Sequence, residues 1–250
     1  PDFETKSSYS VTVTSTDGSL VKSETFTVNV SNVNEAPTAI ALSANVIAEN
    51  VIVGTGVEVG TLTVTDPDAS GNNNVLTVDD TTNFKIENGK LIFIGSSPDF
   101  ETKSSYSVTV TSTDGSLVKS QLFTINVTDV NDNAPVFTSG DTGAVAENAV
   151  ITTVIYTAVT TDADVTGTNK AVVYSLKDGQ DKALLDIDSA TGEVTLKASA
   201  NYEAKTSYSF TVVATNAGTD ATLTTEKAVT VNVTDVNDNA PVFTSGDTGA

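Results

Sequence analysis

The residues of this chain best suited to chemistry are carboxylates, which recur in short spaced motifs. Asp99 and Glu101 form one pair, and Asp162 and Asp164 form another. Side chains two residues apart on an extended chain point to the same side, so each pair can converge on one point. Further carboxylates of this kind are Glu49, Asp129 and Asp132. Such oxygens, joined by asparagine and main-chain oxygens, suit Ca²⁺, which takes roughly six to eight hard ligands.

The composition excludes several other chemistries. The 250 residues include 12 Lys and 32 Asp or Glu, for a formal net charge of −20, and Arg, Cys, Met, His and Trp are absent. Without Cys or His there is no disulfide framework, no thiolate or imidazole metal site and no Ser-His-Asp triad. An acidic chain without Arg repels phosphate, so we expect binding neither to nucleic acid nor to an anionic membrane surface. No run of roughly 18 apolar residues is present, so we expect no insertion into a membrane.

Two long stretches of the sequence occur twice. Residues 1–23 recur unchanged at 98–120, and residues 126–144 recur unchanged at 232–250. The copies lie 97 and 106 positions apart. That period suits a whole β-sandwich domain and is too long for one coil of a solenoid. The sequence therefore indicates tandem duplication of complete domains.

The repeat predicts two complete domains with partial ones at both ends. We expect the complete domains at residues 37–135 and 136–241. Residues 1–36 correspond to the last third of a preceding unit, and residues 242–250 to the start of a following one. The chain opens within a repeated motif, so we expect it to be a piece of a longer protein.

The local pattern predicts strands throughout. Tyr106, Val108 and Val110 alternate with Ser and Thr, and the same alternation returns in the other units. Alternation of period two with one apolar face is typical of half-buried antiparallel strands, and the Tyr and Phe residues fall on the inward positions. We expect seven strands per unit and no helix. In the second complete unit they should cover residues 137–146, 150–161, 170–176, 184–188, 192–197, 207–215 and 227–234.

The leading partial unit supplies only a final hairpin, near residues 8–16 and 24–31. A lone two-stranded hairpin is marginally stable in water. We therefore expect this hairpin to be mobile, or to borrow sheet partners from a neighbouring molecule.

The pattern is specific because four separated motifs occur in a fixed order and at similar spacings along the chain. They are Ala-Glu-Asn at 48–50, Pro-Asp-Phe-Glu at 98–101, Asp-Val-Asn-Asp-Asn-Ala-Pro at 129–135 and Asp-Ala-Asp at 162–164. These motifs resemble the calcium-binding motifs of cadherin repeats, and Leu-Asp-Ile-Asp followed by Thr-Gly-Glu-Val resembles a cadherin hairpin. Strands rich in Thr and Val, without Cys, are similar to the cadherin-like repeats of large bacterial RTX-type surface adhesins. The resemblance implies an all-β fold of tandem seven-strand Greek-key sandwiches arranged end to end.

The resemblance also implies ligands for about three Ca²⁺ ions at the 135/136 junction. The outermost ion would take Glu49, Asp99, Glu101 and Asp132. The middle ion would take Glu49, Glu101, Asp132, Asp164 and the carbonyl of Val130. The third would take Asp162, Asp164, Asn131 and the carbonyls of Asn133 and Asn169. Asn216 stands where the family usually has an Asp for the third ion, so we expect that ion to bind most weakly.

Other junctions depart further from the family pattern. The linker at 32–37 reads Asn-Val-Asn-Glu-Ala-Pro, one residue shorter than its counterpart, and we expect one or two ions at the 36/37 junction. The residues that match there are Asp2, Glu4, Asn34, Glu35, Asp66, Asp68, Asn72 and Asp114. After the second complete unit Glu147, Glu203 and Asp238 match, whereas Asn201 replaces the first Asp of its motif.

The acidic residues also have interpretations that involve no metal site. Acidic residues in β-loops are usually only solvated, and general acidity is typical of salt-adapted proteins. The four motifs in register, and strand faces that carry Thr and Ser instead of acid, favour a site. Paired carboxylates also catalyse glycoside hydrolysis, but no aromatic-lined cleft accompanies these pairs, so we expect no enzyme.

The sequence thus predicts calcium-rigidified extender or adhesin repeats of an extracellular, cell-surface protein. Pro37, Pro135 and Pro241 bias the linkers toward extended backbone. The expected partners are neighbouring repeats of the same chain, with carbohydrate or a cell surface contacted through other regions. A carbohydrate-binding or homophilic adhesion module is the alternative.

Overall fold

The computed structural model describes residues 1–68, 74–165, 170–217 and 223–244. Contacts divide the chain into two units, Pro1–Thr128 and Asp129–Ala250. The described regular structure is almost entirely β-strand, as expected, with one short 3₁₀ turn at Lys182–Leu184. Within the described ranges no helix has the length and apolar character needed to cross a membrane.

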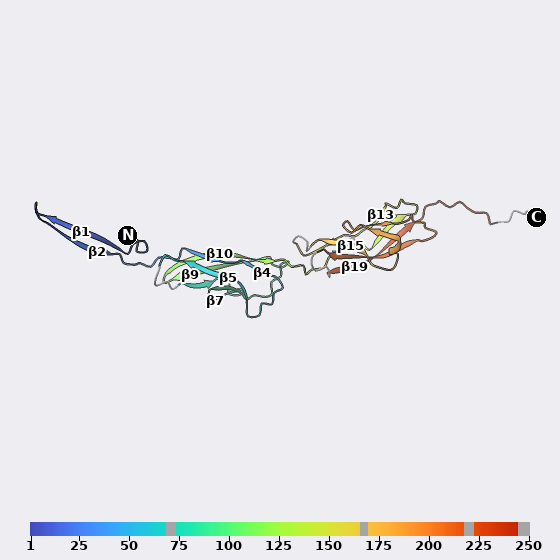
Figure 1. Cartoon of the computed structure of the whole chain (residues 1–250). Coiled ribbons are helices and arrows are strands. Elements are labelled where there is room, and N and C mark those ends of the chain that lie inside the picture. The colour runs from blue at the N-terminus through green and yellow to red at the C-terminus, as the bar shows by residue number, and fades with distance from the viewer. Residues whose placement is uncertain (69–73, 166–169, 218–222, 245–250) are drawn as a thin grey trace, which may run out of the picture. The chain divides into compact units, whose positions relative to one another are not determined.

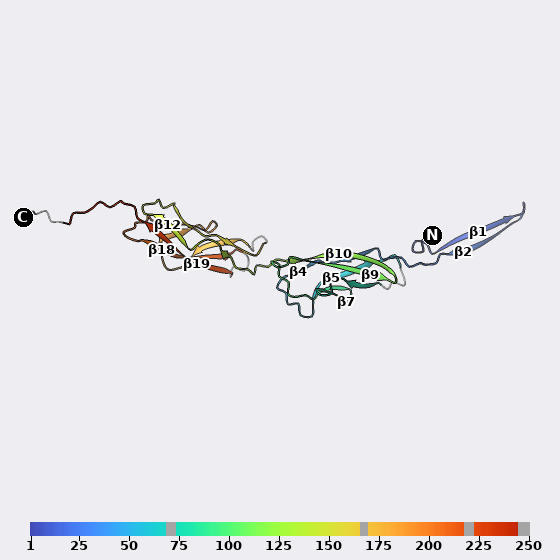
Figure 2. The same cartoon turned by 180° about the vertical axis from the view of Figure 1, so that it is seen from behind.

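The first unit contains a hairpin followed by a sandwich of two four-stranded sheets (Figure 1; Figure 2). One sheet has the order β3-β5-β8-β7 and the other β4-β10-β9-β6, in which β4 and β10 are parallel. The strands are β1 (Ser8–Thr16), β2 (Val21–Asn29), β3 (Ala39–Leu42), β4 (Val46–Ala48), β5 (Val57–Thr65), β6 (Val75–Val78), β7 (Phe84–Glu87), β8 (Lys90–Phe93), β9 (Ser105–Asp114) and β10 (Leu117–Thr128).

The core of the first sandwich lies between its two sheets. Phe84 and Phe93 come from one sheet, Val108 and Val110 from the other, and all four side chains are at most 1% exposed. The Phe84 and Phe93 rings meet edge to face with centroids 5.5 Å apart, a favourable aromatic geometry. Ser107, Thr109 and Thr111, which alternate with the inward residues of β9, are more exposed than Val108 and Val110, which confirms the predicted alternation.

The second unit repeats the sandwich. Its sheets have the orders β12-β19-β18-β15, β13-β17-β16 and β11-β14. Its core includes Leu185, Val194, Phe210, Val212 and Val231, each at most 2% exposed. The strands are β11 (Val136–Phe137), β12 (Thr142–Ala146), β13 (Val154–Thr157), β14 (Thr160–Thr161), β15 (Val172–Leu176), β16 (Leu185–Ile187), β17 (Glu193–Leu196), β18 (Ser207–Asn216) and β19 (Thr224–Thr234).

Two predicted strands of this unit are each divided into two segments. The strand expected at 137–146 appears as β11 and β12, and the strand expected at 150–161 appears as β13 and β14. The division follows from the pairing, because β11 is antiparallel to β14 whereas β12 is parallel to β19. The chain therefore changes partner strands between Phe137 and Thr142, and no single strand can run through that change.

The leading hairpin forms as expected but buries neither face. Every residue of β1 and β2 is exposed, and these strands pair only with each other among the described residues. The sequence of β1 is that of the first nine residues of β9, so Val11 corresponds to Val108. Val11 is 47% exposed and Val108 is fully buried, because β9 is covered by the opposite sheet.

Candidate metal centres at the ends of the repeats

The loop that follows β5 in the first unit places an Asp-x-Asp motif at one end of the sandwich. The Asp68 amide donates to Asp66 Oδ1 at 3.1 Å, a local turn that Asp favours. Asp68 is only 3% exposed. Its carboxylate accepts hydrogen bonds from the Glu35 amide at 2.8 Å and from Asn32 Nδ2 at 3.3 Å. The motif thus ties the preceding linker to the sandwich.

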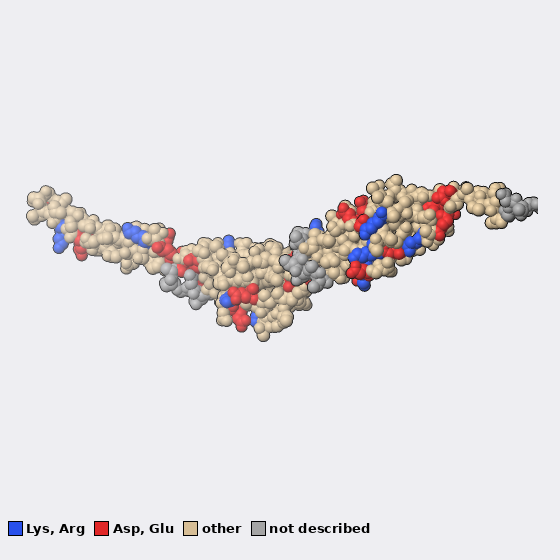
Figure 3. Space-filling view, turned by 45° about the vertical axis from the view of Figure 1, so that its right-hand side comes forward, with Lys and Arg blue, Asp and Glu red and all other residues tan. Residues whose placement is uncertain are grey.

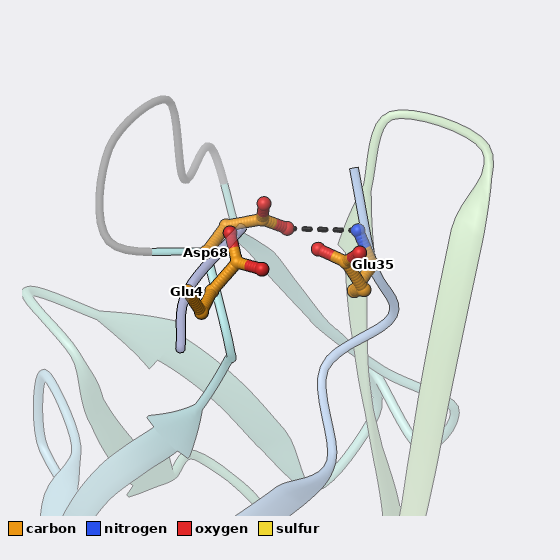
Figure 4. A group of neighbouring side chains, drawn as sticks. All are labelled: Glu4, Glu35 and Asp68. Carbon is orange, nitrogen blue, oxygen red and sulfur yellow. Dashed lines mark hydrogen bonds between the residues drawn. The ribbon is translucent and has the colours of Figure 1, made fainter. Parts of the chain in front are cut away.

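Three carboxylates from separate segments meet around Asp68. Glu4, Glu35 and Asp68 each bring a carboxylate oxygen within 4.8 Å of the others, and Figure 4 shows the three groups pointing toward one another. Burial raises the pKa of the Glu35 carboxyl, and the charges of Glu4 and Asp68 raise it further. Like charges that approach this closely disfavour the ionised form unless a cation joins them.

A second group shares Asp68 and reaches the end of β9. Asp66, Asp68 and Asp114 also bring oxygens within 4.8 Å of one another. Asp114 is the last residue of β9, is 3% exposed, and its Oδ2 atom is buried with no hydrogen-bond partner in the described part of the chain. A buried carboxylate oxygen without a partner carries a substantial desolvation penalty. The observed set of hard oxygens fits Ca²⁺, which would satisfy that oxygen.

The second unit has a corresponding end built around Asp162 and Asp164. The Asp164 amide donates to Asp162 Oδ1 at 3.1 Å, and Asp164 accepts from the Asn133 amide at 3.3 Å. Asn216, the last residue of β18, is fully buried and donates through Nδ2 to Asn131 Oδ1 at 2.6 Å and to the Asn133 carbonyl at 3.0 Å. Burial raises the pKa of the Asp162 carboxyl. This end therefore joins the linker to β18 through amide hydrogen bonds.

The Ala-Glu-Asn motif places a buried glutamate at the other end of each sandwich. Glu49 and Glu147 are 3% and 2% exposed. The residues that follow, Asn50 and Asn148, have φ values of 57° and 60°, a left-handed conformation that Asn tolerates better than most residues. In the first unit Glu49 Oε2 accepts a hydrogen bond from the Phe100 amide at 2.7 Å. The motif thus fixes the glutamate against the Pro-Asp-Phe-Glu loop.

In the second unit Glu147 holds two backbone segments and joins a third acidic group. It accepts hydrogen bonds from the Val236 amide at 2.7 Å and from the Tyr202 amide at 2.8 Å, which lower the pKa of its carboxyl. Glu147, Glu203 and Asp235 bring oxygens within 4.8 Å of one another. Asp235 was not predicted, although it opens the second copy of the linker motif and corresponds to Asp129.

An Asp or Asn closes a turn at the second position of both Pro-Asp-Phe-Glu motifs and of their counterpart Ala-Asn-Tyr-Glu at 200–203. Asp2, Asp99 and Asn201 each accept a hydrogen bond through Oδ1 from the amide three positions later, at 3.2, 2.9 and 2.8 Å. Hydrogen bonds from Thr5 and Thr102 respectively lower the pKa values of the Asp2 and Asp99 carboxyls. Asparagine at 201 therefore keeps the turn while removing one charge, a role that the metal-ligand interpretation had missed.

Six other predicted ligands fall into three situations. Asn34 and Val130 lie exposed in the linkers, and Asp132 accepts from Asn133 Nδ2 at 2.6 Å. Asn72 and Asn169 lie outside the described residues. In the second unit Asp238 accepts hydrogen bonds from amide side chains instead of joining the group at Glu147. Those donors are Asn148 Nδ2 at 2.6 Å and Asn239 Nδ2 at 2.7 Å.

Lysine ion pairs engage other acids of the chain. Lys90 pairs with Glu58 at 2.8 Å, and Lys177 pairs with Glu226 at 2.7 Å, and all four side chains are about half exposed. Figure 3 shows lysines beside acidic side chains on the visible face of the second unit. Exposed pairs of this kind contribute little to stability, so a substitution in one of them is a suitable control for substitutions in the buried carboxylate groups.

Residues 141–234, which include the buried Glu147, match the family described as Cadherin domain. The second unit is therefore a cadherin-like repeat. It is 31% identical over 260 aligned residues to human Protocadherin Fat 1, covering 98% of this chain and 6% of that protein. The chain therefore spans a small part of the length of this relative.

Solved cadherin structures share the fold. The structure titled "Protocadherin gammaB7 EC3-6 cis-dimer structure" matches with a TM-score of 0.73 and 31% identity, over 96% of this chain and 61% of that one. Mouse Cadherin-23 EC22-24 matches with a TM-score of 0.70 and 25% identity, over 94% of this chain and 77% of that one. These likenesses confirm the predicted cadherin-like sandwiches.

Proposed function

We propose that the chain binds Ca²⁺ at the acidic ends of its cadherin-like repeats and serves as extracellular extender or adhesin repeats stiffened by that ion. The observation that carries the proposal is the buried Asp114 carboxylate, whose Oδ2 atom lacks a partner within the described residues and which lies beside Asp66 and Asp68. Two unit charges of like sign at 4 Å repel by about 4 kcal/mol at an effective dielectric of 20. Bound Ca²⁺ would turn that repulsion into shared coordination.

The residues that would hold the ion come from the segments already described. At the first end they are Glu4, Glu35, Asp66, Asp68 and Asp114, and at the far end of the second repeat Glu147, Glu203 and Asp235. Because Glu35 belongs to a linker and Asp68 to a sandwich, shared coordination would restrict the linker. Extracellular calcium modules bind at about 10⁻⁴–10⁻³ M, which suits an extracellular setting.

The same proposal includes a bacterial origin for the repeats and a place on the cell surface. The absence of Cys and the Thr- and Val-rich strands favour a bacterial surface adhesin, whereas the relatives named above are animal cadherins. Homophilic adhesion is the second candidate, favoured by the 31% identity to a protocadherin whose structure is described as a cis-dimer. That candidate predicts self-association dependent on residues outside the acidic ends.

The test is a Ca²⁺ titration of the full chain, by calorimetry and by thermal melting after removal of metal. Wild type should bind near millimolar Ca²⁺ and melt at a higher temperature when loaded. Asp68→Asn, which alters both groups of the first repeat, should lose heat of binding and part of the melting shift. Glu58→Gln is the matched control, because it removes one exposed charge outside the groups. Equal titrations of all three proteins, or no binding by any, would refute the proposal.

A further inference from the structure

The strands that end at the two acidic Asp-x-Asp loops are matched, except for their last residue. β9 and β18 are both ten residues long, and β9 ends on Asp114 whereas β18 ends on Asn216. Both side chains are at most 3% exposed. The neighbouring Asp-x-Asp turns are also alike, with an amide-to-carboxylate distance of 3.1 Å in each. The two ends are thus one local structure with a carboxylate in one repeat and an amide in the other.

The amide at position 216 makes contacts that a carboxylate cannot make. Asn216 Nδ2 donates both to Asn131 Oδ1 and to the Asn133 carbonyl, and both acceptors belong to the linker before β11. A carboxylate has no proton to donate, so an Asp there would face these two oxygens with unfavourable electrostatics. Only a bound cation would then join the strand end to the linker.

The first repeat shows the opposite arrangement. Asp114 lies within 4.8 Å of Asp66 and Asp68 and has a buried oxygen without a partner among the described residues. The linker is fastened there by Glu35 and Asn32, whose N–H groups donate to Asp68. Without a cation, the end of β9 therefore adds negative charge to the group and offers no hydrogen-bond donor.

We propose that Asn216 fastens the linker of the second repeat without a cation, so that the two repeats differ in their dependence on Ca²⁺. The inference rests on the proposed calcium binding for the first repeat, but the fastening itself needs no metal. In the presence of a chelator the linker around Asn131–Asn133 stays attached to β18. The linker around Asn32–Glu35 then keeps only its hydrogen bonds to Asp68, beside clustered carboxylates, and loosens more readily. Asp162 Oδ2, which is buried and has no partner in the described ranges, leaves the second end a residual affinity for a cation.

Reciprocal substitutions test this inference, because the chain contains both residues at matched positions. Asn216→Asp should lower the melting temperature of the second repeat in EDTA and increase its calcium-induced shift. Asp114→Asn should do the reverse in the first repeat. Asn216→Ala, which removes the donor without adding charge, should lose stability in EDTA and gain no affinity for Ca²⁺. Residue-resolved amide exchange in EDTA should show the Asn133 amide at least tenfold more protected in wild type than in Asn216→Ala.

The outcomes separate the inference from the function on which it rests. If wild type and Asp114→Asn both fail to bind Ca²⁺, the proposed function is wrong, and the exchange data still decide whether Asn216 fastens the linker. If wild type binds Ca²⁺ but Asn216→Asp melts and titrates like wild type, the inference is wrong. Equal Asn133 protection in wild type and Asn216→Ala would also overturn it.

Discussion

At the scale of single residues, Glu35 links the stability of the first repeat to pH. Its pKa is raised in the folded chain above the reference value of 4.5, because burial and neighbouring carboxylates disfavour its ionised form. The folded state therefore binds this proton more tightly than the unfolded state does. The ionised carboxyl destabilises the metal-free fold at neutral pH, and that penalty is relieved as the pH falls through the raised pKa.

Glu35→Gln should therefore raise the melting temperature of the metal-free first repeat at pH 7. The difference from wild type should shrink as the pH falls through the raised pKa and vanish well below the reference value of 4.5, where Glu35 is protonated in both states. Melting curves in EDTA between pH 4 and 8, compared with those of Glu58→Gln, would measure it. A variant that melts lower than wild type at pH 7 would contradict the expectation.

Sequence reasoning identified the acidic positions better than it identified what each one does. Motif spacing pointed to Asp68, Asp114 and Glu147, and the structure buries all three. It did not foresee that Asp99 closes a local turn, although a Thr three positions later is a signal of that turn. It treated Asn216 only as a lost charge, because its partners lie more than 80 residues away in the sequence.

At the scale of elements, the leading hairpin shows how far burial depends on context. The sequence of β1 is that of the first nine residues of β9, yet only β9 pairs on both sides and lies against an opposite sheet. Alternation predicted both strands equally well, because periodicity records which face can be buried and not whether anything covers it. The division between β11 and β12 likewise depends on which strands they pair with. The alternation of apolar residues in the sequence does not mark it.

Hydrogen exchange should separate these two copies of one sequence. Amides of β1 should exchange at least a hundredfold faster than their counterparts in β9, because an uncovered two-stranded hairpin opens locally at little cost. Identical side chains at matched positions make the intrinsic exchange rates nearly equal, so the ratio reports the fold alone. Comparable protection at Val11 and Val108 would mean that the hairpin is covered in solution.

At the scale of the whole molecule, the net charge of −20 should make the stability of the fold depend on salt, in addition to any specific binding of Ca²⁺. Monovalent salt screens exposed charges beyond a Debye length of about 10 Å at 0.1 M, but it cannot coordinate buried oxygens. Mg²⁺ coordinates oxygens but requires near-octahedral geometry and retains water. Screening of charge and coordination of an ion therefore predict different rankings of Ca²⁺, Mg²⁺ and Na⁺ by how much each stabilises the fold.

The full chain should be stabilised most by CaCl₂, less by MgCl₂ and least by NaCl at equal ionic strength. Thermal melting after dialysis against chelator gives this order directly. Asp68→Asn should narrow the difference between CaCl₂ and NaCl without changing the response to NaCl. Three equal shifts would mean that the clustered carboxylates act only as part of the general charge.

The duplicated strand has a consequence for how the number of repeats in such a chain can change. Residue 1 corresponds to residue 98, and the two copies agree over 23 positions, so a gene encoding both offers an aligned site for unequal crossing-over. An exchange there adds or deletes 97 residues, which is one whole sandwich. The exchanged hairpin keeps the alternation of β9, and with it the face that meets Phe84 and Phe93. Recombination within this segment therefore alters the number of repeats while each remaining repeat keeps a complete core.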